Sequence, residues 1–216
     1  MASHPVKPGE HMVRIAADEK VASYRTLWDH ASNKDLASKR KNPNILLPGD
    51  VVNLPNPAPK TASAPTEKVS KFVAASKDQL DIRVVLLDEN NQPLKSLKCQ
   101  FLEEGRETTS DGSGMLERLE ISPRFELGVL RFDYRKDVRL AFAIAVGHLD
   151  PLDTPSGLQA RLNNLGYYAG EIGYADEDQI ALKCAIEEFE KENGLKPAGD
   201  PASATMQNKL KDVFGC

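Results

Sequence analysis

The spacing of apolar residues changes along this 216-residue chain, and this change limits the folds available to it. Before residue 30 and again after residue 150, apolar side chains recur every three or four positions, which is the helical period. Between about residues 80 and 146 they alternate with polar ones, as in half-buried strands. Because neither pattern covers the whole chain, the sequence predicts an α+β protein made of several small domains.

A segment rich in proline, alanine and serine separates the first helical part from the alternating part. Residues 55–65 belong to this segment and carry no periodic apolar pattern, so we interpret residues 56–77 as a linker. The predicted organisation is an N-terminal domain at residues 1–55, a β-domain at 78–150 and a helical domain at 151–216.

The first two domains each carry a recognisable order of elements. In the first, a strand near residues 4–7, two helices and a closing strand at 50–54 predict a βααβ order, and we interpret the basic run at 34–41 as a solvated surface loop. In the second, the alternating runs are separated by turn signals such as residues 110–114. They predict an antiparallel β-sandwich.

The last domain carries three helix-start signals. They are Thr154 before Pro155, Asp176 three residues before Gln179, and Asp200 before Pro201. Each signal precedes an apolar stripe at helical spacing, so the sequence predicts three packed helices.

Composition excludes two classes of function. A net charge of -4 and an isoelectric point near 5.7 argue against a nucleic-acid-binding protein, which normally has a basic surplus on one face. No apolar run approaches the roughly 18 residues of a membrane helix, so we expect no membrane partner. The N-terminus has no recognisable secretory signal peptide, so we expect synthesis in the cytoplasm without a signal-peptide route of export.

Two motifs in the first domain resemble those of the LysM family. Residues 6–12 read V-K-P-G-E-H-M, where the family has V-x-x-G-D-T-L, and residues 42–52 read N-P-N-I-L-L-P-G-D-V-V, near the family's N-P-N-x-I-x-P-G-x-x-L. The resemblance implies binding of N-acetylglucosamine-containing glycans in a shallow groove between two loops. Carried over by position, the groove is lined by Gly9, Glu10 and His11 on one side and by Asn44, Ile45 and Leu46 on the other. Hydroxyls and acetamides bind to such hydrogen-bonding groups beside an apolar floor.

The last domain resembles the three-helix peptidoglycan-binding domain attached to many cell-wall hydrolases. The resemblance rests on L-x-x-L-G-Y-Y at residues 162–168, F-x-x-x-x-G-L at 189–195, and the order of Asp200, Thr205 and Leu210. It implies a ligand loop near residues 171–176, with candidate binding residues Tyr167, Tyr168, Tyr174 and Asp176. In this family the third helix packs over the second, which implies a disulfide between Cys184 and Cys216.

The middle domain resembles immunoglobulin-like or transthyretin-like modules through its strand pattern alone. The order of all three domains is similar to that of small peptidoglycan-binding proteins encoded beside type VI secretion spike genes. This resemblance implies a non-catalytic peptidoglycan-binding protein that acts in the periplasm or at the cell wall after delivery by an injection machine. One alternative is a structural adaptor or cargo carrier that binds a secretion spike or effector protein.

A second alternative is a cell-wall amidase or peptidase. The four histidines form no H-E-x-x-H motif, and His148 with Asp150 lacks a third metal ligand nearby, so we expect no metal and no cofactor. Cys99 lies in an alternating apolar run, where a thiol is more often a core residue than a nucleophile. The sequence therefore predicts that the protein is not an enzyme and has no catalytic residues.

Overall fold

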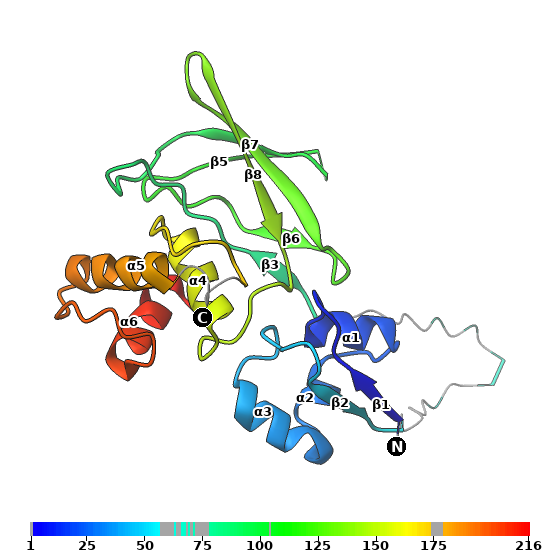
Figure 1. The fold of residues 1–216 in the computed structure, drawn as a ribbon. Helices are drawn as coiled ribbons and strands as arrows, with labels where there is room; N and C mark the ends of the chain where they lie inside the picture. Colours follow the sequence, from blue (N-terminus) through cyan, green and yellow to red (C-terminus); the bar gives the residue numbers. More distant parts are fainter. Residues whose placement is uncertain are drawn as a thin grey trace.

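The computed structural model of the chain describes residues 2–56, 63, 66, 67, 69, 71, 78–103, 105–173 and 179–216. Its six α-helices and eight strands, counted over these residues, confirm the predicted α+β class. Figure 1 shows the helices gathered at the two ends of the chain, with one pair of strands beside the N-terminal helices and the other strands in the middle. Three separate clusters of buried apolar residues lie within residues 6–54, 80–146 and 152–210.

The N-terminal part is closed by a pair of short strands. β1 (Ala2–Pro5) and β2 (Val51–Leu54) are antiparallel, with Ala2 opposite Leu54 and Pro5 opposite Val51. Between them lie α1 (Met12–Asp18), α2 (Arg25–Trp28), the 3-10 turn η1 (Ala31–Asn33) and α3 (Lys34–Arg40). Asn33 is buried and joins η1 to β2, because its side chain donates to the carbonyl of Asn53 and accepts from the Asn53 N–H.

The interpretation of residues 34–41 as a surface loop is wrong. These residues form α3, and the left-handed Lys41 (φ +61°) ends the helix. Two contacts fix α3 on the domain: Leu36 is buried in the core cluster, and Arg40 reaches across to Asp50. The remaining basic side chains face solvent, which explains why charge alone suggested a loop.

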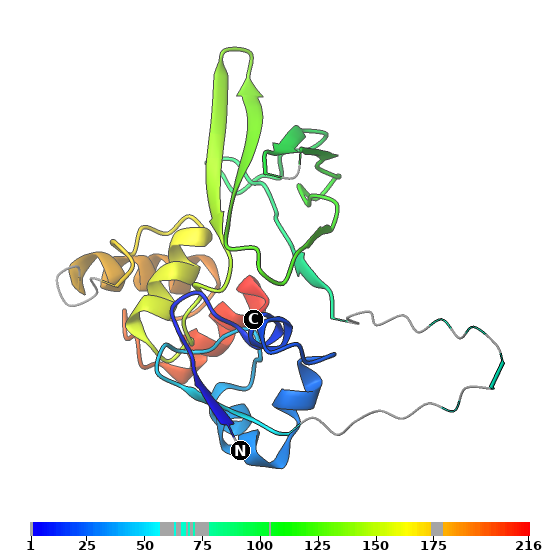
Figure 2. The same cartoon turned by 90° about the vertical axis from the view of Figure 1, so that its right-hand side faces the viewer.

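The middle part contains two antiparallel sheets that share one core cluster. β3 (Leu80–Ile82) pairs with β6 (Leu119–Ile121), and a four-stranded sheet has the order β5-β4-β7-β8. The strands of the four-stranded sheet are β4 (Lys98–Phe101), β5 (Arg106–Thr109), β7 (Leu127–Arg135) and β8 (Val138–Ala145). The long β7–β8 hairpin projects from the rest of the molecule in both views (Figures 1 and 2).

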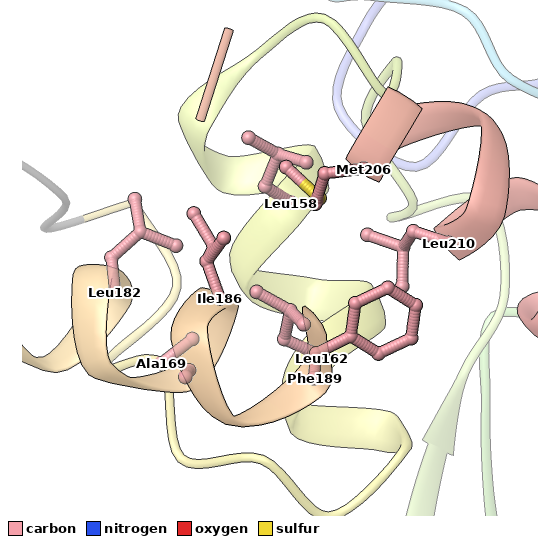
Figure 3. Packing of buried hydrophobic residues seen from close by; sticks show 9 residues of the cluster. Leu158, Leu162, Ala169, Leu182, Ile186, Phe189, Met206 and Leu210 are labelled. Carbon is pink, nitrogen blue, oxygen red and sulfur yellow. The ribbon is translucent and has the colours of Figure 1, made fainter. Parts of the chain in front are cut away.

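The C-terminal helices pack around one cluster. α4 (Pro155–Asn164), α5 (Gln179–Glu192) and α6 (Ala204–Phe214) direct Leu158, Leu162, Ile186, Phe189, Met206 and Leu210 toward one another (Figure 3). The α4 start is as predicted, with the Thr154 hydroxyl accepting from the Gly157 N–H. The α6 start is not: Ser203 caps the helix, whereas Asp200 caps a preceding turn at Ala202.

Four charged side chains of alternating sign join the N-terminal part to the middle part. On α1, Arg14 and Asp18 lie one turn apart on the same face. Arg14 pairs with Glu126, and Asp18 accepts from Arg124 at 2.6 Å. Arg124 also donates to the carbonyl of Ala17 at 3.0 Å. This set of two ion pairs, the α1 charge quartet, lies at the surface.

Candidate functional site

A pocket of about 200 Å³ lies where three segments of the chain meet. The first is the loop between β1 and α1, the second is the loop between α3 and β2, and the third is the connection between β8 and α4. Its lining residues are Lys7, Pro8, Gly9, Glu10, Leu46, Pro48, Gly147, His148 and Asp150. The pocket thus has apolar prolines and a leucine beside groups of both charges.

Two glycines allow the first and third segments to approach closely. Gly9 and Gly147 both adopt positive φ angles, of +80° and +83°. A Cβ on Gly9 would lie 2.9 Å from Nε2 of His148, and a Cβ on Gly147 would overlap the carbonyl oxygen of Gly9. Because any side chain at either position would collide, glycine is required twice for the His148 ring to cover the first loop.

Glu10 is fixed at the edge of the pocket by two hydrogen bonds. Its Oε2 atom accepts from the Lys7 N–H at 2.9 Å and lies 2.7 Å from His4 Nε2. Burial raises the pKa of Glu10, but these hydrogen bonds outweigh burial and hold the pKa below its ordinary value. Glu10 therefore presents a carboxylate, not a carboxylic acid, near neutral pH.

His11 lies beneath the pocket and does not line it. It is the N-cap of α1, and its Nδ1 atom accepts from the Arg14 N–H at 3.4 Å. The residue is only 2% exposed, and Nε2 has no hydrogen-bond partner among the residues that the structure describes. Burial, helped by the charge of Arg14, lowers the pKa of His11 to about 4. His11 is therefore a neutral structural residue whose ring supports the approach of Gly147.

A buried ion pair shapes the second loop. Asp50 accepts from Arg40 Nε at 2.6 Å and from Arg40 Nη2 at 2.8 Å, and it also accepts from the Leu47 N–H. Burial raises the pKa of Asp50, but these hydrogen bonds outweigh it and lower the pKa. The Met12 N–H donates to the Pro43 carbonyl, so α3, the second loop and the start of α1 form one unit.

The structure brings together three of the six groove residues predicted from the sequence. Gly9, Glu10 and the buried Leu46 line the pocket, whereas His11, Ile45 and the exposed Asn44 do not. The residues that sequence reasoning missed are Lys7, Pro8, Pro48, Gly147, His148 and Asp150. A local signal existed for the first three, which flank the recognised motifs. The others lie more than 90 residues away in the sequence.

The C-terminal candidate residues separate into one packed and one exposed tyrosine. Tyr167 packs edge-on against Phe189, with ring centroids 5.6 Å apart, and its hydroxyl donates to Glu192 at 2.7 Å. Burial and this hydrogen bond raise the pKa of Tyr167 well above its ordinary value. Tyr168 is 75% exposed. The other two candidates, Tyr174 and Asp176, lie outside the described residues.

Two amide side chains of α4, the buried Gln159 and the half-buried Asn163, hold the loop that carries Tyr168. Gln159 donates to the Ala169 carbonyl and accepts from the Gly173 N–H, both at 3.1 Å. Asn163 accepts from the Ala169 N–H and donates to the Gly170 carbonyl. The loop is therefore attached to the helix by four hydrogen bonds, and Tyr168 projects from a fixed base.

The predicted disulfide between Cys184 and Cys216 is not formed, and both thiols are free. Cys184 lies on the exposed side of α5, away from the stripe of Leu182, Ala185, Ile186 and Phe189 that packs in the core. Cys216 is directed toward α4, where its carbonyl accepts from Arg161 Nε at 3.3 Å. The two cysteines therefore lie in different environments: Cys184 is exposed on α5, and Cys216 is half-buried beside α4.

A hollow of about 300 Å³ on the four-stranded sheet offers less chemistry. Three of its charged side chains already have partners within the hollow, since Arg131 donates to Gln100 and Arg139 donates to Asp133 at 2.7 Å. Among the residues described, no group of three or more His, Cys, Asp or Glu side chains is arranged to hold a metal ion. None of the described helices combines the length and apolar character that crossing a membrane requires.

The chain matches none of the protein-family models, curated proteins or solved structures with which it was compared. The two features of the molecule that indicate a function are therefore the pocket between the three segments and the exposed Tyr168.

Proposed function

We propose that this chain is a non-catalytic peptidoglycan-binding protein, with a LysM-like N-terminal domain and a three-helix peptidoglycan-binding domain at its C-terminus. The single observation that carries the proposal is the pocket that joins Gly9, Glu10 and Leu46. These residues come from the two loops between which the resemblance places the glycan groove.

The chemistry of the pocket suits a sugar. The exposed Pro8 and Pro48 supply apolar surface above the buried Leu46, while the Lys7 ammonium and the Glu10 carboxylate are placed to bind hydroxyl or acetamide groups. The pocket is smaller than the roughly 300–1,000 Å³ of sites that enclose drug-sized ligands. Its size favours one sugar residue or acetamide group at the end or side of a glycan strand.

Tyr168 supports a second contact with the wall. A tyrosine ring with an exposed face stacks on sugars and peptides while its hydroxyl stays in water. The hydrogen bonds from Gln159 and Asn163 hold the Tyr168 loop before any ligand arrives, which lowers the entropy lost on binding. Two weak sites on one chain raise the overall affinity if one glycan strand or two neighbouring strands can reach both.

The test is co-sedimentation of the full chain with purified peptidoglycan sacculi. We expect retention of the wild type, and about tenfold weaker retention of Lys7→Ala, which removes a charged donor from the pocket. Lys34→Ala is the matched control, because Lys34 is an exposed lysine of the same domain outside the pocket. Loss of the wild type from the pellet at low salt, or equal retention of both variants, contradicts the proposal.

One observation favours the alternative of a structural adaptor or cargo carrier for a secretion spike. The first loop is already covered by protein, since His148 packs on Gly9. A loop that accepts protein in this way suits contact with another protein. Both proposals place the chain beside a bacterial injection machine and at the cell wall or in the periplasm. The adaptor predicts no retention on sacculi together with binding to a spike or effector protein.

A further inference from the structure

The strand β8 is an open sheet edge of unusual composition. In the part of the chain that the structure describes, the four-stranded sheet ends at β8, and β7 is its one neighbour. β8 is eight residues long and carries a single charged residue, Arg139, which is already paired with Asp133. The opposite edge, β5, is four residues long and carries Arg106 and Glu107. Short and charged edges resist pairing with other strands, whereas long apolar edges favour it.

The open edge is accessible from solvent. Phe142 is 51% exposed and Val138 is 43% exposed, and the alanines at 141, 143 and 145 are also exposed. The β7–β8 hairpin projects beyond the rest of the molecule, as both views show (Figures 1 and 2). The projecting part of β8 is therefore accessible to a second strand.

The backbone hydrogen bonds identify which residues of β8 point outward. The Val146 N–H donates to the Glu126 carbonyl, so the even-numbered residues bond to β7. Because successive backbone groups alternate in direction, the N–H and carbonyl groups of Arg139, Ala141, Ala143 and Ala145 point to the open side. These are the groups that an added strand would bond.

The sequence of the edge reads nearly the same in both directions. Residues 138–146 are V-R-L-A-F-A-I-A-V. An antiparallel copy centred on Phe142 places Val138 opposite Val146, Leu140 opposite Ile144, Ala141 opposite Ala143, and Phe142 opposite itself. Every apolar side chain then meets one of similar size. A two-fold symmetric interface requires this kind of self-complementarity.

Charge and geometry agree with this symmetric pairing. The two Arg139 side chains would lie opposite Ala145 at the two ends, roughly 20 Å apart by strand rise, so their repulsion is screened. Phe142 would form a non-hydrogen-bonded pair, in which facing Cα atoms are about 4.5 Å apart and side chains contact. The flanking alanines, with outward backbone groups, would exchange the hydrogen bonds.

We propose that two copies of this chain associate through antiparallel pairing of β8 with β8 about a two-fold axis at Phe142, which joins their sheets into one continuous sheet. The β8 residues that support this proposal lie outside the pocket and do not include Tyr168, so the proposal is independent of glycan binding.

The first experiment is sedimentation equilibrium of the full chain from micromolar to millimolar concentration. We expect a reversible monomer–dimer equilibrium. Ala143→Pro removes an outward N–H without touching the bonds to β7, and we expect it to raise the Kd about tenfold or more. Glu107→Pro is the matched control, because it makes the same change at the β5 edge. A wild type that stays monomeric throughout, or an equal effect of both prolines, overturns the proposal.

The second experiment tests the axis itself. Phe142→Lys and Phe142→Glu each place two like charges face to face, so each variant alone is expected to be monomeric where the wild type is dimeric. A mixture of the two places opposite charges at the axis, and we expect dimers to return as heterodimers. Absence of heterodimers in the mixture overturns the symmetric register. The circular dichroism and melting of each variant verify that it is folded.

Discussion

Mild acid should weaken the N-terminal part of the protein through His11. The ring is buried beneath the contact between Gly9 and Gly147, and its pKa is lowered from an ordinary value of 6.5 to about 4. The unfolded chain therefore binds the proton more readily than the folded chain does. The stabilisation that the neutral ring contributes is complete above about pH 6.5 and is lost as the pH falls toward 4.

The expected loss follows from the two pKa values. One pKa unit corresponds to about 1.4 kcal/mol, so protonation linked to His11 lowers the free energy of unfolding by about 2 kcal/mol at about pH 5. Glu10 and Asp50 add little in this range, because hydrogen bonds keep both carboxyl pKa values below their ordinary values. His11→Asn removes the titrating group and keeps an acceptor for the Arg14 N–H, since asparagine is a good N-cap.

The assay is urea unfolding followed by tryptophan fluorescence at about pH 7.5 and about pH 5, where His11 changes its contribution most. Trp28 is the single tryptophan of the chain and packs against the N-terminal core cluster, so its emission reports this domain alone. The wild type should lose about 2 kcal/mol more than His11→Asn between the two pH values. Any change in the free energy of unfolding that the substitution causes equally at both pH values cancels in this comparison. Equal losses in the two proteins would refute the argument from burial.

Three further outcomes are expected. Asp50→Asn should lower the free energy of unfolding by about 3 kcal/mol, because it leaves the buried Arg40 guanidinium without its carboxylate, and Trp28 fluorescence during urea unfolding measures the change. Gly147→Ala should detach the connection before α4 from the first loop, since a methyl group would overlap that loop, and faster amide hydrogen exchange at residues 9–12 would report it. In the native protein Cys184 should react rapidly with a thiol reagent while Cys99 stays protected until unfolding, because Cys99 is buried and burial raises its pKa.

Elements with strong local signals were predictable from the sequence. The Thr154 cap, Pro155 and the apolar stripe of α4 agree with one another, and the structure forms that helix as expected. β5 and β6 were not predicted, because they are short and partly charged. β5 pairs with β4 through backbone hydrogen bonds, and its R-E-T-T sequence has no alternation of apolar and polar residues. α3 was misinterpreted because only Leu36 marks its buried face.

The candidate pocket was only partly predictable, for a different reason. The motifs around Gly9 and Leu46 are local and lie close to their predicted places. The third wall comes from Gly147 and His148, whose contact with Gly9 spans about 140 residues and depends on how the domains are arranged. The apolar periodicity of a single segment does not predict this contact. Once the fold is known, the two glycines at positive φ mark the close approach of the two segments.

The α1 charge quartet gives the junction between the N-terminal and middle parts a polarity. Exposed ion pairs add little stability, so these four residues act mainly on orientation. If α1 were reversed end to end against the same loop, Arg14 would face Arg124 and Asp18 would face Glu126, and both pairs would repel. The quartet therefore favours one orientation of α1 against the middle part over the reverse orientation. This electrostatic preference should weaken as salt is added.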